Sequence, residues 1–202
     1  MFISFEGIEG SGKSTLLAGV AARLRSEGRE TLETREPGGT PAGETIRRLF
    51  LEPGLRIDPL TETLLINASR AQLVAEAIEP ALARGKTVLV DRYVDSTLAY
   101  QGYARGLDLA TVRGICEAAT AGRLPELTLL VDISLETSRA RVAARNGAAD
   151  RIDAQDLAFH RRVRDGYLDL ARTQPRIVLL DGEAEPPRVL EAAMRAIARV
   201  AT

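Results

Sequence analysis

The stretch that decides the fold is Gly7-Ile8-Glu9-Gly10-Ser11-Gly12-Lys13-Ser14, with Thr15 directly behind it. It follows an apolar run at residues 2–5, which is typical of a buried strand. Apolar residues at the spacing of one helix face come after it. A glycine-rich loop between a strand and a helix is the setting in which this spacing binds phosphate. The alternative is a glycine-rich turn in which Lys-Ser occurs by chance. Such a turn would not need a strand before it and a helix after it, and this loop has both.

The residue types of this loop suit a nucleotide. Glycines have no Cβ, so the backbone can curl and bring several N–H groups to one point, where the positive end of the next helix also acts. Lys13 offers a cation to the β- and γ-phosphates, and the Ser14 hydroxyl suits Mg²⁺. We therefore expect the nucleotide phosphates on Gly7, Ile8, Glu9, Gly10, Ser11, Gly12, Lys13, Ser14 and Thr15.

Composition narrows the class of protein. The 202 residues suit one α/β domain spanning 1–202, and the net charge of −1 does not indicate binding to nucleic acid or to an anionic membrane. The single cysteine, Cys116, excludes an intrachain disulfide and is expected to pack inside a helix. No signal peptide precedes Glu6, and no apolar run reaches the ~20 residues of a membrane helix. These features predict a cytoplasmic protein.

Five segments have strand character. Four are near-continuous apolar runs, at 2–5, 87–90, 127–131 and 177–180, and a more polar fifth at 31–34 is expected towards an edge. Apolar runs without alternation indicate strands that are covered on both faces, hence a parallel sheet. Helical patterns separate the strands. The sequence predicts a three-layer α/β fold with a five-stranded parallel sheet and helices on both faces.

Each strong strand is followed by an acidic residue, and ligands of such sheets bind beyond the carboxyl ends of the strands. Asp91, next to a phosphate loop, is expected to be the second partner of Mg²⁺ beside Ser14. Arg92 can contact a phosphate through two N–H groups. For Asp132 and Asp181 a structural role at the strand ends is favoured.

Two segments between the strands carry polar residues, and the spacing of these residues does not decide whether they bind a ligand or only contact solvent. The loop 35–40 reads Arg-Glu-Pro-Gly-Gly-Thr and precedes a helix at 41–51, and its charges could be loop polarity only. A long helix is expected from about 60 to 84, bent by Pro80. Ile66 and Arg70 share one face of it, where Arg70 could extend to water or hold an anion.

The segment 141–153 has the composition of a lid. Arg141 and Arg145 lie one helical turn apart, and small residues follow before Arg151. Such a loop can close over phosphates, although a solvated basic face is the alternative. The only histidine, His160, has no acid in an evident pairing and is expected at the surface.

The order of these motifs resembles that of the bacterial-type thymidylate kinases along essentially the whole chain. The Arg-Glu-Pro-Gly-Gly-Thr loop, with Asp-Arg-Tyr downstream, is far more specific than the phosphate loop alone. The matching segments are 5–7, 9–15, 35–40, 70–72, 91–93, 96, 99–102, 124–125, 127–128 and 150–152.

This resemblance implies an enzyme that moves the γ-phosphoryl group of ATP to dTMP with Mg²⁺, and a homodimer. It implies a catalytic set of Lys13, Arg92, Glu9 and the lid arginines Arg145 and Arg151, with Arg141 beside adenine. Within this set, Glu9 would face the acceptor sugar and its 3′-hydroxyl. The region of about 35–105 would bind the acceptor. Its residues are Glu36, Pro37, Ile66, Arg70, Arg92, Ser96, Thr97, Tyr100 and Gln101.

Two positions depart from what the resemblance leads us to expect. Ile66 stands where an aromatic residue would stack on thymine, which removes stacking worth about 0.5–1.5 kcal/mol. Glu126 stands where an aspartate is usual, which should affect structure only. Another version of the family has an arginine in the phosphate loop where this chain has Gly10, so the compensating cation is expected in the lid.

Two other functions compete with this one. A kinase for another nucleoside monophosphate would share the phosphate loop and the arginines. A non-catalytic nucleotide-binding module is the second alternative, but it should have lost some of Lys13, Asp91, Arg92 and Arg151, all of which are present.

Overall fold

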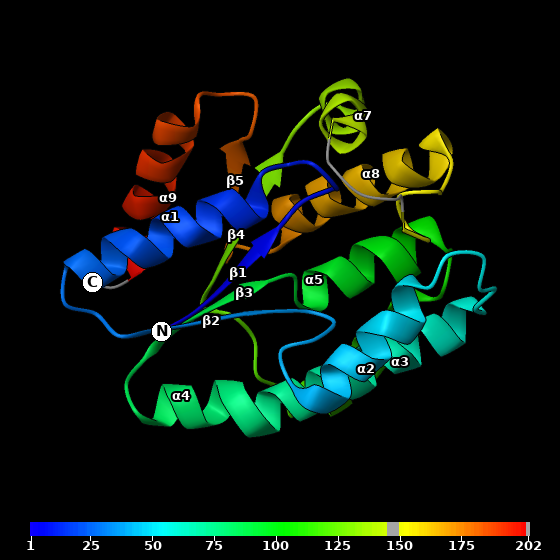
Figure 1. Ribbon diagram of the computed structural model, residues 1–202, viewed down its shortest axis with the longest axis horizontal. Helices are drawn as coiled ribbons and strands as arrows, with labels where there is room; N and C mark the ends of the chain where they lie inside the picture. The colour runs from blue at the N-terminus through cyan, green and yellow to red at the C-terminus, as the bar shows by residue number, and fades with distance from the viewer. Residues whose placement is uncertain (145–149, 201–202) are drawn as a thin grey trace.

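Five short segments pair side by side into a parallel sheet (Figure 1). The computed structural model describes residues 1–144 and 150–200. The strands run in the order β2-β3-β1-β4-β5, and every pair is parallel, which confirms the predicted sheet. Their bounds are β1 Phe2–Glu6, β2 Thr31–Arg35, β3 Thr87–Asp91, β4 Leu127–Asp132 and β5 Ile177–Asp181.

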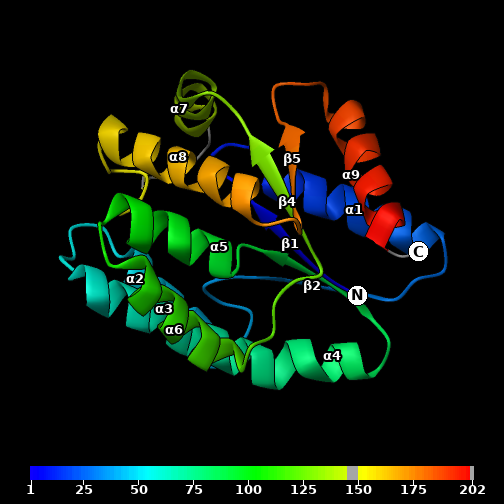
Figure 2. The ribbon, with the colours of Figure 1, turned by 180° about the vertical axis from the view of Figure 1, so that it is seen from behind.

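Both faces of the sheet are buried, which explains the uninterrupted apolar runs. Phe2, Val88 and Val90 belong to one apolar cluster, while Ile3 and Leu89 belong to the cluster on the opposite face. The second cluster is completed by α1 (Lys13–Ser26) and α9 (Pro186–Val200), which lie together on one side in Figure 2. Successive strand residues therefore alternate between two cores, and the molecule has three layers.

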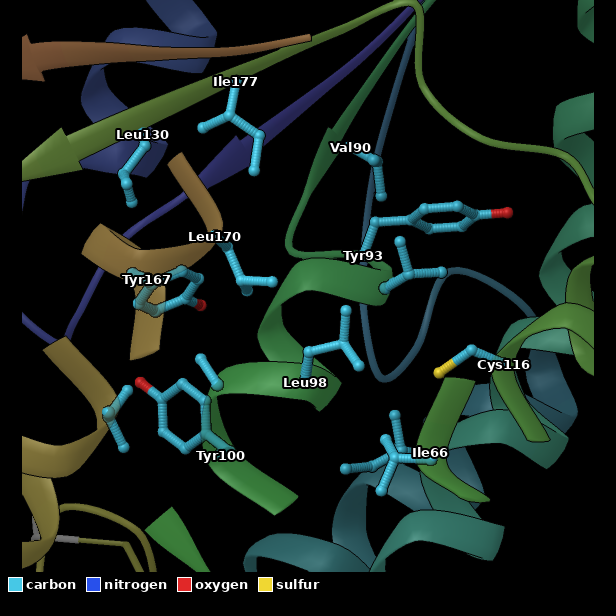
Figure 3. Close-up of a cluster of buried hydrophobic side chains, with 14 of the residues drawn as sticks. Ile66, Val90, Tyr93, Leu98, Tyr100, Cys116, Leu130, Tyr167, Leu170 and Ile177 are labelled. Carbon is cyan, nitrogen blue, oxygen red and sulfur yellow. The ribbon is translucent and has the colours of Figure 1, made fainter. Parts of the chain in front are cut away.

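The other face supports most of the remaining helices. Figure 3 shows Val90, Leu130 and Ile177 of the strands gathered with Tyr93 and Leu98, which follow β3. The α-helices that contribute buried residues to this cluster are α2 (Pro41–Leu51), α3 (Pro59–Leu73), α4 (Glu79–Ala83), α5 (Val94–Thr97), α6 (Leu109–Thr120) and α8 (Leu157–Thr173). Cys116 of α6 is buried in it, as predicted.

The polar strand β2 lies at an edge of the sheet beside β3, as predicted. None of its residues is fully buried. An edge strand has only one hydrogen-bonded neighbour and less apolar cover, so its sequence needs fewer apolar residues. The helix α7 (Leu135–Ala143) follows β4 in the chain.

The expected helix from about 60 to 84 is not a single α-helix. After α3, a π-helical turn, η1 (Val74–Ile78), leads into the short helix α4 (Glu79–Ala83), which contains Pro80. Proline has no N–H for the hydrogen bond to the preceding turn, and its ring crowds that turn. The wider π turn lies directly before the position where the α-helical pattern would fail. A second π-helical segment, η2 (Leu98–Ala104), continues α5.

The register of the sheet determines where the loops after β1, β2 and β3 begin. Phe5 of β1 pairs with Asp91 of β3, and Arg35 of β2 pairs with the same Asp91. The loops that leave β1, β2 and β3 therefore start at one edge. None of the helices in the described ranges has the length and apolar character to cross a membrane.

We predict opposite effects for two helical glycine substitutions. A Cβ on Gly166 of α8 would lie 2.7 Å from Cγ of Tyr103, whereas a Cβ on Gly114 of α6 meets no atom within 4 Å. Gly166→Ala should lower the free energy of unfolding by about 1–3 kcal/mol through overpacking. Gly114→Ala should raise it by roughly 0.5–1 kcal/mol, because alanine has less backbone freedom to lose. Urea denaturation of both variants measures this; equal effects would contradict the close contact between α8 and η2.

Candidate active site

A cleft of about 1020 Å³ opens at the carboxyl edge of the sheet. Its wall contains the loop residues from Glu9 to Thr15 together with Asp91 and Arg141. The acceptor residues predicted from the sequence also line this cleft, although they come from different elements. They are Glu36, Pro37, Ile66, Arg70, Arg92, Ser96, Thr97, Tyr100 and Gln101.

Gly7 and Ile8 support the loop from behind and do not line the cleft. Gly7 has a φ of +142°, and a Cβ on it would lie 2.4 Å from the carbonyl oxygen of Val131. Only glycine fits such an approach to the backbone of β4 without a shift. The tight turn lets α1 begin at Lys13, with its free N–H groups at the loop.

Lys13 is folded back onto the loop. Its Nζ donates hydrogen bonds to the carbonyl oxygen of Ile8 at 3.0 Å and to Ser11 Oγ at 3.4 Å. Burial, aided by the nearby Arg92, lowers the pKa of Lys13 to about 8. A phosphate in the loop would favour the charged form again, so Lys13 gains a natural partner when an anion binds.

Ser14 and Asp91 meet at the end of the loop. The Ser14 hydroxyl donates a hydrogen bond of 2.6 Å to Asp91 Oδ2. Both offer the hard oxygen ligands that Mg²⁺ prefers, so the pair predicted from the sequence fits this ion. Within residues 1–144 and 150–200, no group of three or more His, Cys, Asp or Glu residues could hold a metal. Phosphate oxygens and water would therefore complete the coordination shell.

Arg92 is held in an unusual backbone conformation, with a φ of 70°. Non-glycine residues seldom adopt this region, so other contacts must fix it. Its Nη1 donates to the carbonyl oxygen of Gly7 at 3.0 Å and to the hydroxyls of Ser96 and Tyr167. Its Nη2 lies 3.0 Å from Glu9 Oε1. The guanidinium thus joins the end of β3 to the phosphate loop.

Glu6 lies fully buried behind Arg92. Its carboxylate accepts hydrogen bonds from Tyr93 N at 2.8 Å, Ser96 Oγ at 2.6 Å and the Tyr167 hydroxyl at 3.0 Å. Burial, together with the negative charge of Asp95, raises the pKa of Glu6 to about 7. The hydroxyls of Ser96 and Tyr167, which accept hydrogen bonds from Arg92, therefore also contact a carboxyl group whose pKa is near neutral.

Arg70 and Glu36 form a buried ion pair in the acceptor half, with Arg70 Nη2 2.6 Å from Glu36 Oε2. The other N–H groups of Arg70 reach Asn67 Oδ1, Cys116 Sγ, the Tyr93 carbonyl oxygen and Thr97 Oγ1. All five donors of the guanidinium are engaged by the protein. Arg70 faces the cleft, as its place beside Ile66 suggested, but it is also the fixed centre of that wall.

The predicted lid arginines are placed differently from one another. Arg141 donates to the carbonyl oxygens of Gly10 at 3.3 Å and Gly182 at 3.2 Å. Arg151 is buried and does not line the cleft; its Nε donates to the Phe50 carbonyl oxygen, and its Nη1 pairs with Glu62. Arg145 lies outside the described residues.

Comparison with known proteins identifies the family. The family model described as thymidylate kinase matches residues 5–193. The chain belongs to the thymidylate kinase family. It is 52% identical to the thymidylate kinase of Deinococcus radiodurans over 192 residues, covering 95% of this chain and 93% of that protein. It is also 52% identical to the Syntrophotalea carbinolica thymidylate kinase over 187 residues, covering 89% and 87% of the two chains.

A solved structure agrees in fold. The crystal structure of thymidylate kinase from Ehrlichia chaffeensis superposes with a TM-score of 0.79 at 32% identity, covering 98% of each chain. The resemblance noted from the sequence motifs is therefore confirmed for the family and for the fold.

The thymidylate kinase site contains residues that the sequence did not single out. Arg47 of α2 lines the cleft and donates to the Pro37 carbonyl oxygen at 3.0 Å. Burial and the neighbouring Arg35 lower the pKa of Arg47. A desolvated arginine with a like charge nearby is suited to an anion. Its position nearly two turns into α2, the helix after the 35–40 loop, was the available signal.

The nucleotide end of the cleft was also incomplete in the sequence prediction. Beyond Arg141, the cleft is lined by Gly182 and Ala184 of the loop after β5 and by the first residues of α9. The sequence analysis assigned these residues no role in binding. The α9 residues that line the cleft are Pro186, Pro187, Val189 and Leu190.

His160 is a clear error of the sequence prediction. Its side chain is only 15% exposed, and its Nδ1 lies 3.3 Å from Glu9 Oε2. The predicted surface position without an acidic partner is therefore wrong. No local pattern shows this contact, because α8 and the phosphate loop meet only through the tertiary fold.

Gly10 separates this chain from the version of the family with an arginine in the loop. Its φ is +72°, and a Cβ there would lie 3.0 Å from the Ser138 carbonyl oxygen and 3.2 Å from Arg141 Cβ. An arginine at this position would require α7 to move. A further cation for the phosphates, in addition to Lys13, would therefore have to come from another element.

We predict that Glu6→Gln changes how stability depends on pH. In the folded protein the pKa of Glu6 rises from its ordinary 4.5 to about 7, so the folded state binds the proton more tightly than the unfolded state. This contribution is full below about pH 4.5 and is lost as the pH rises through 7. Between pH 5 and pH 8, about 1–3 kcal/mol of unfolding free energy should be lost in the wild type relative to the variant.

Urea denaturation at several pH values measures this difference. Glu27→Gln, at an exposed position after α1, is the control and should follow the wild type at every pH. Parallel pH curves for the wild type and Glu6→Gln would contradict the raised pKa of Glu6.

Proposed function

We propose that this protein transfers the γ-phosphoryl group of ATP to dTMP, giving ADP and dTDP for deoxynucleotide synthesis. The observation that carries this proposal is one cleft that is lined both by the phosphate loop and by Arg47, Arg70 and Arg92. Membership of the thymidylate kinase family supports dTMP as the acceptor.

The donor half would hold ATP. The amides of the loop and Lys13 suit the β- and γ-phosphates, and α1 adds its positive end. Arg141, fixed by the carbonyl oxygens of Gly10 and Gly182, would lie along the adenine with the apolar start of α9. Ser14 and Asp91 would hold Mg²⁺, which supplies charge neutralisation on the phosphates when bound.

The acceptor half would hold dTMP. Arg92 and Arg47 are the cleft arginines best suited to its phosphate, because both are desolvated and lie near one another. Ile66 and the Arg70–Glu36 pair would form the base side of the wall. Gln101, Thr97, Ser96 and Tyr100 would add polar contacts to base and sugar, and Pro37 would close the side next to Arg47.

Catalysis would then consist of positioning and charge stabilisation. A loose phosphoryl transition state needs little covalent chemistry from the protein, so no general base is required. Lys13 and Arg92 would lie on either side of the transferring phosphoryl group. Arg145 and Arg151 are proposed as lid cations, and Arg151 would first have to leave Glu62. Glu62 would retain Arg105, which lies 3.1 Å away.

We further propose a cytoplasmic homodimer that does not bind nucleic acid. The balanced charge of the chain supports the last point. Exposed leucines on α2 and α3, namely Leu49, Leu60 and Leu64, offer an apolar face for a second copy. The molar mass in solution, measured by light scattering, distinguishes dimer from monomer.

An acceptor panel with a loop variant tests the proposed function. In a coupled ADP-release assay, dTMP should be preferred over dUMP, AMP, CMP and GMP. Lys13→Ala should lower kcat by at least about 100-fold while the fold survives, since it removes a cation from the transferring group. Lys86→Ala, at a partly exposed ion pair with Glu30, is the matched control and should keep wild-type turnover. Preference for another acceptor, or normal turnover of Lys13→Ala, would refute the assignment.

A second prediction concerns the base. Ile66 lines the cleft, and a phenylalanine there would add stacking on thymine worth about 0.5–1.5 kcal/mol. We expect Ile66→Phe to lower the KM for dTMP by about 2- to 10-fold. The KM for ATP should not change, and Ile66→Leu, which keeps an aliphatic contact, should behave like the wild type. An equal or higher KM of Ile66→Phe for dTMP would show that this side chain does not face the base.

A further inference from the structure

Glu6 stands at the end of β1, and its two carboxylate oxygens have different partners. Oε1 accepts a hydrogen bond from the backbone N–H of Tyr93 at 2.8 Å. Oε2 accepts one from the Ser96 hydroxyl at 2.6 Å and one from the Tyr167 hydroxyl at 3.0 Å. The side chain is fully buried and does not line the cleft. Glu6 can therefore act on the reaction only through its neighbours.

The two hydroxyl groups that contact Glu6 also contact Arg92. Nη1 of Arg92 donates to Ser96 Oγ at 3.2 Å and to the Tyr167 hydroxyl oxygen at 3.1 Å. The two hydroxyl oxygens lie 2.7 Å apart, so they form one group between the carboxylate and the guanidinium. Arg92 lines the cleft, whereas Tyr167 does not. A carboxylate outside the cleft is thus linked to an arginine of the cleft wall.

The chemistry of these groups decides the direction of each hydrogen bond. A guanidinium only donates and an ionised carboxylate only accepts, whereas a hydroxyl group can do both. The protons of Ser96 and Tyr167 therefore point towards Glu6, either directly or from one hydroxyl to the other, and their lone pairs face Arg92. If a hydroxyl proton turned towards Arg92 instead, two donors would meet and the hydrogen bond would be lost. The carboxylate thus keeps both hydroxyls as acceptors for the arginine.

The orientation of Arg92 depends on such acceptors. Its φ of 70° lies in a region that non-glycine residues seldom adopt, so the surrounding contacts must maintain this conformation. Nη1 has a third acceptor in the Gly7 carbonyl oxygen at 3.0 Å, and Nη2 pairs with Glu9. An arginine that is fixed in this way loses little conformational freedom when it binds an anion.

The charges around Glu6 determine the pH at which it is an acceptor only. Burial, together with the like charge of Asp95 in α5, raises the pKa of Glu6 to about 7. Arg92 acts in the opposite direction, and Lys13 of α1 and Arg176 before β5 are further positive groups that interact with this carboxylate. The ionised form of Glu6 therefore predominates at pH 8 and the protonated form at pH 6.

We infer that Glu6 is a positioning residue for Arg92. By accepting the protons of Ser96 and Tyr167, it keeps the guanidinium oriented for the phosphate of the nucleoside monophosphate. The inference rests on the proposed function, which assigns that phosphate to Arg92. Glutamine cannot replace glutamate in this role, because its amide has only one acceptor oxygen. In one orientation its NH2 group would meet the N–H of Tyr93, and in the other it would turn the hydroxyl protons towards Arg92.

The experiment separates binding of the phosphate from binding of the rest of dTMP. Thymidine has the same base and sugar but no phosphate, so its Ki against dTMP, divided by the KM for dTMP, isolates the phosphate contact. At pH 8 we expect this ratio to fall by about 10-fold in Glu6→Gln and by about 5- to 10-fold in Tyr167→Phe, since each change disturbs hydrogen bonds to a charged group. The KM for ATP should stay unchanged in both variants.

A double variant shows whether Glu6 acts through Tyr167. If the two residues belong to one path, Glu6→Gln combined with Tyr167→Phe should lower the ratio by no more than about 10-fold in total, whereas independent effects would multiply. Two matched controls should keep the wild-type ratio. Glu126→Gln changes a carboxylate that contacts the first residue of β1, and Tyr103→Phe removes a hydroxyl that donates to Asp169 of α8.

A pH series keeps the test decisive if Glu6→Gln does not fold, because the wild type itself then supplies the neutral form of Glu6. The wild-type ratio should exceed that of Tyr167→Phe by about 5- to 10-fold at pH 8 and by less than about 3-fold at pH 6, where Glu6 is mostly protonated. Comparison at the same pH cancels the ionisation of the dTMP phosphate, which both proteins share. A difference of the same size at both pH values would contradict the role of the carboxylate.

The outcomes separate the two proposals. Absence of turnover with any nucleoside monophosphate would refute the proposed function. Turnover of dTMP with an unchanged ratio in Glu6→Gln and Tyr167→Phe would overturn the role of Glu6 and leave the kinase assignment intact. This includes the case in which both variants bind thymidine and dTMP equally less well, which is the result expected of a purely structural residue. Effects that multiply in the double variant would overturn the path through Tyr167.

Discussion

The register between β1 and β3 is the constraint on which the site depends. Phe5 stands opposite Asp91, and the backbone N–H of Arg92 donates to the Phe5 carbonyl oxygen at 3.0 Å. The phosphate loop and the Asp91–Arg92 pair therefore leave the sheet at one level. A slip by one residue would turn every side chain of the shifted strand to the opposite face and separate Ser14 from Asp91. Backbone pairing deep in the core thus determines which side chains meet in the cleft.

The cleft gathers charge inside a protein, and the structure pairs that charge before any ligand is present. An isolated buried charge is unfavourable, so each needs a partner or hydrogen bonds. Arg92 is paired with Glu9, and the hydroxyls around it are supported by Glu6. Lys13 donates hydrogen bonds to neutral oxygens of its own loop. This difference agrees with its lowered pKa and makes Lys13 the cation that gains most from an incoming phosphate.

Much of this arrangement could be predicted from the sequence, for physical reasons. Strands buried on both faces leave uninterrupted apolar runs, and a phosphate loop requires glycines at fixed spacing. The carboxyl-end rule then brings Ser14, Asp91 and Arg92 together without any knowledge of side-chain contacts. The family motifs added the acceptor residues, all of which line the cleft.

The remainder depends on contacts that no local pattern encodes. His160 reaches Glu9 because α8 crosses the cleft wall, and the aromatic contacts that direct it are tertiary. Arg151 was expected beside the phosphates but is paired with Glu62, a residue far away in the chain. The π turn before Pro80 is a local response, yet its type is not specified by the proline alone. Long-range packing decides each of these.

The saturated guanidinium of Arg70 has a consequence for recognition. Because all five of its donors are already engaged, the side chain has no rotamer freedom left to lose when a base arrives. The conformational entropy of the Arg70 side chain is lost when the protein folds, so ligand binding does not have to order this part of the cleft wall. Ligands that fit the wall as it stands should therefore bind with little reorganisation, whereas ligands that must displace Arg70 would break a buried network.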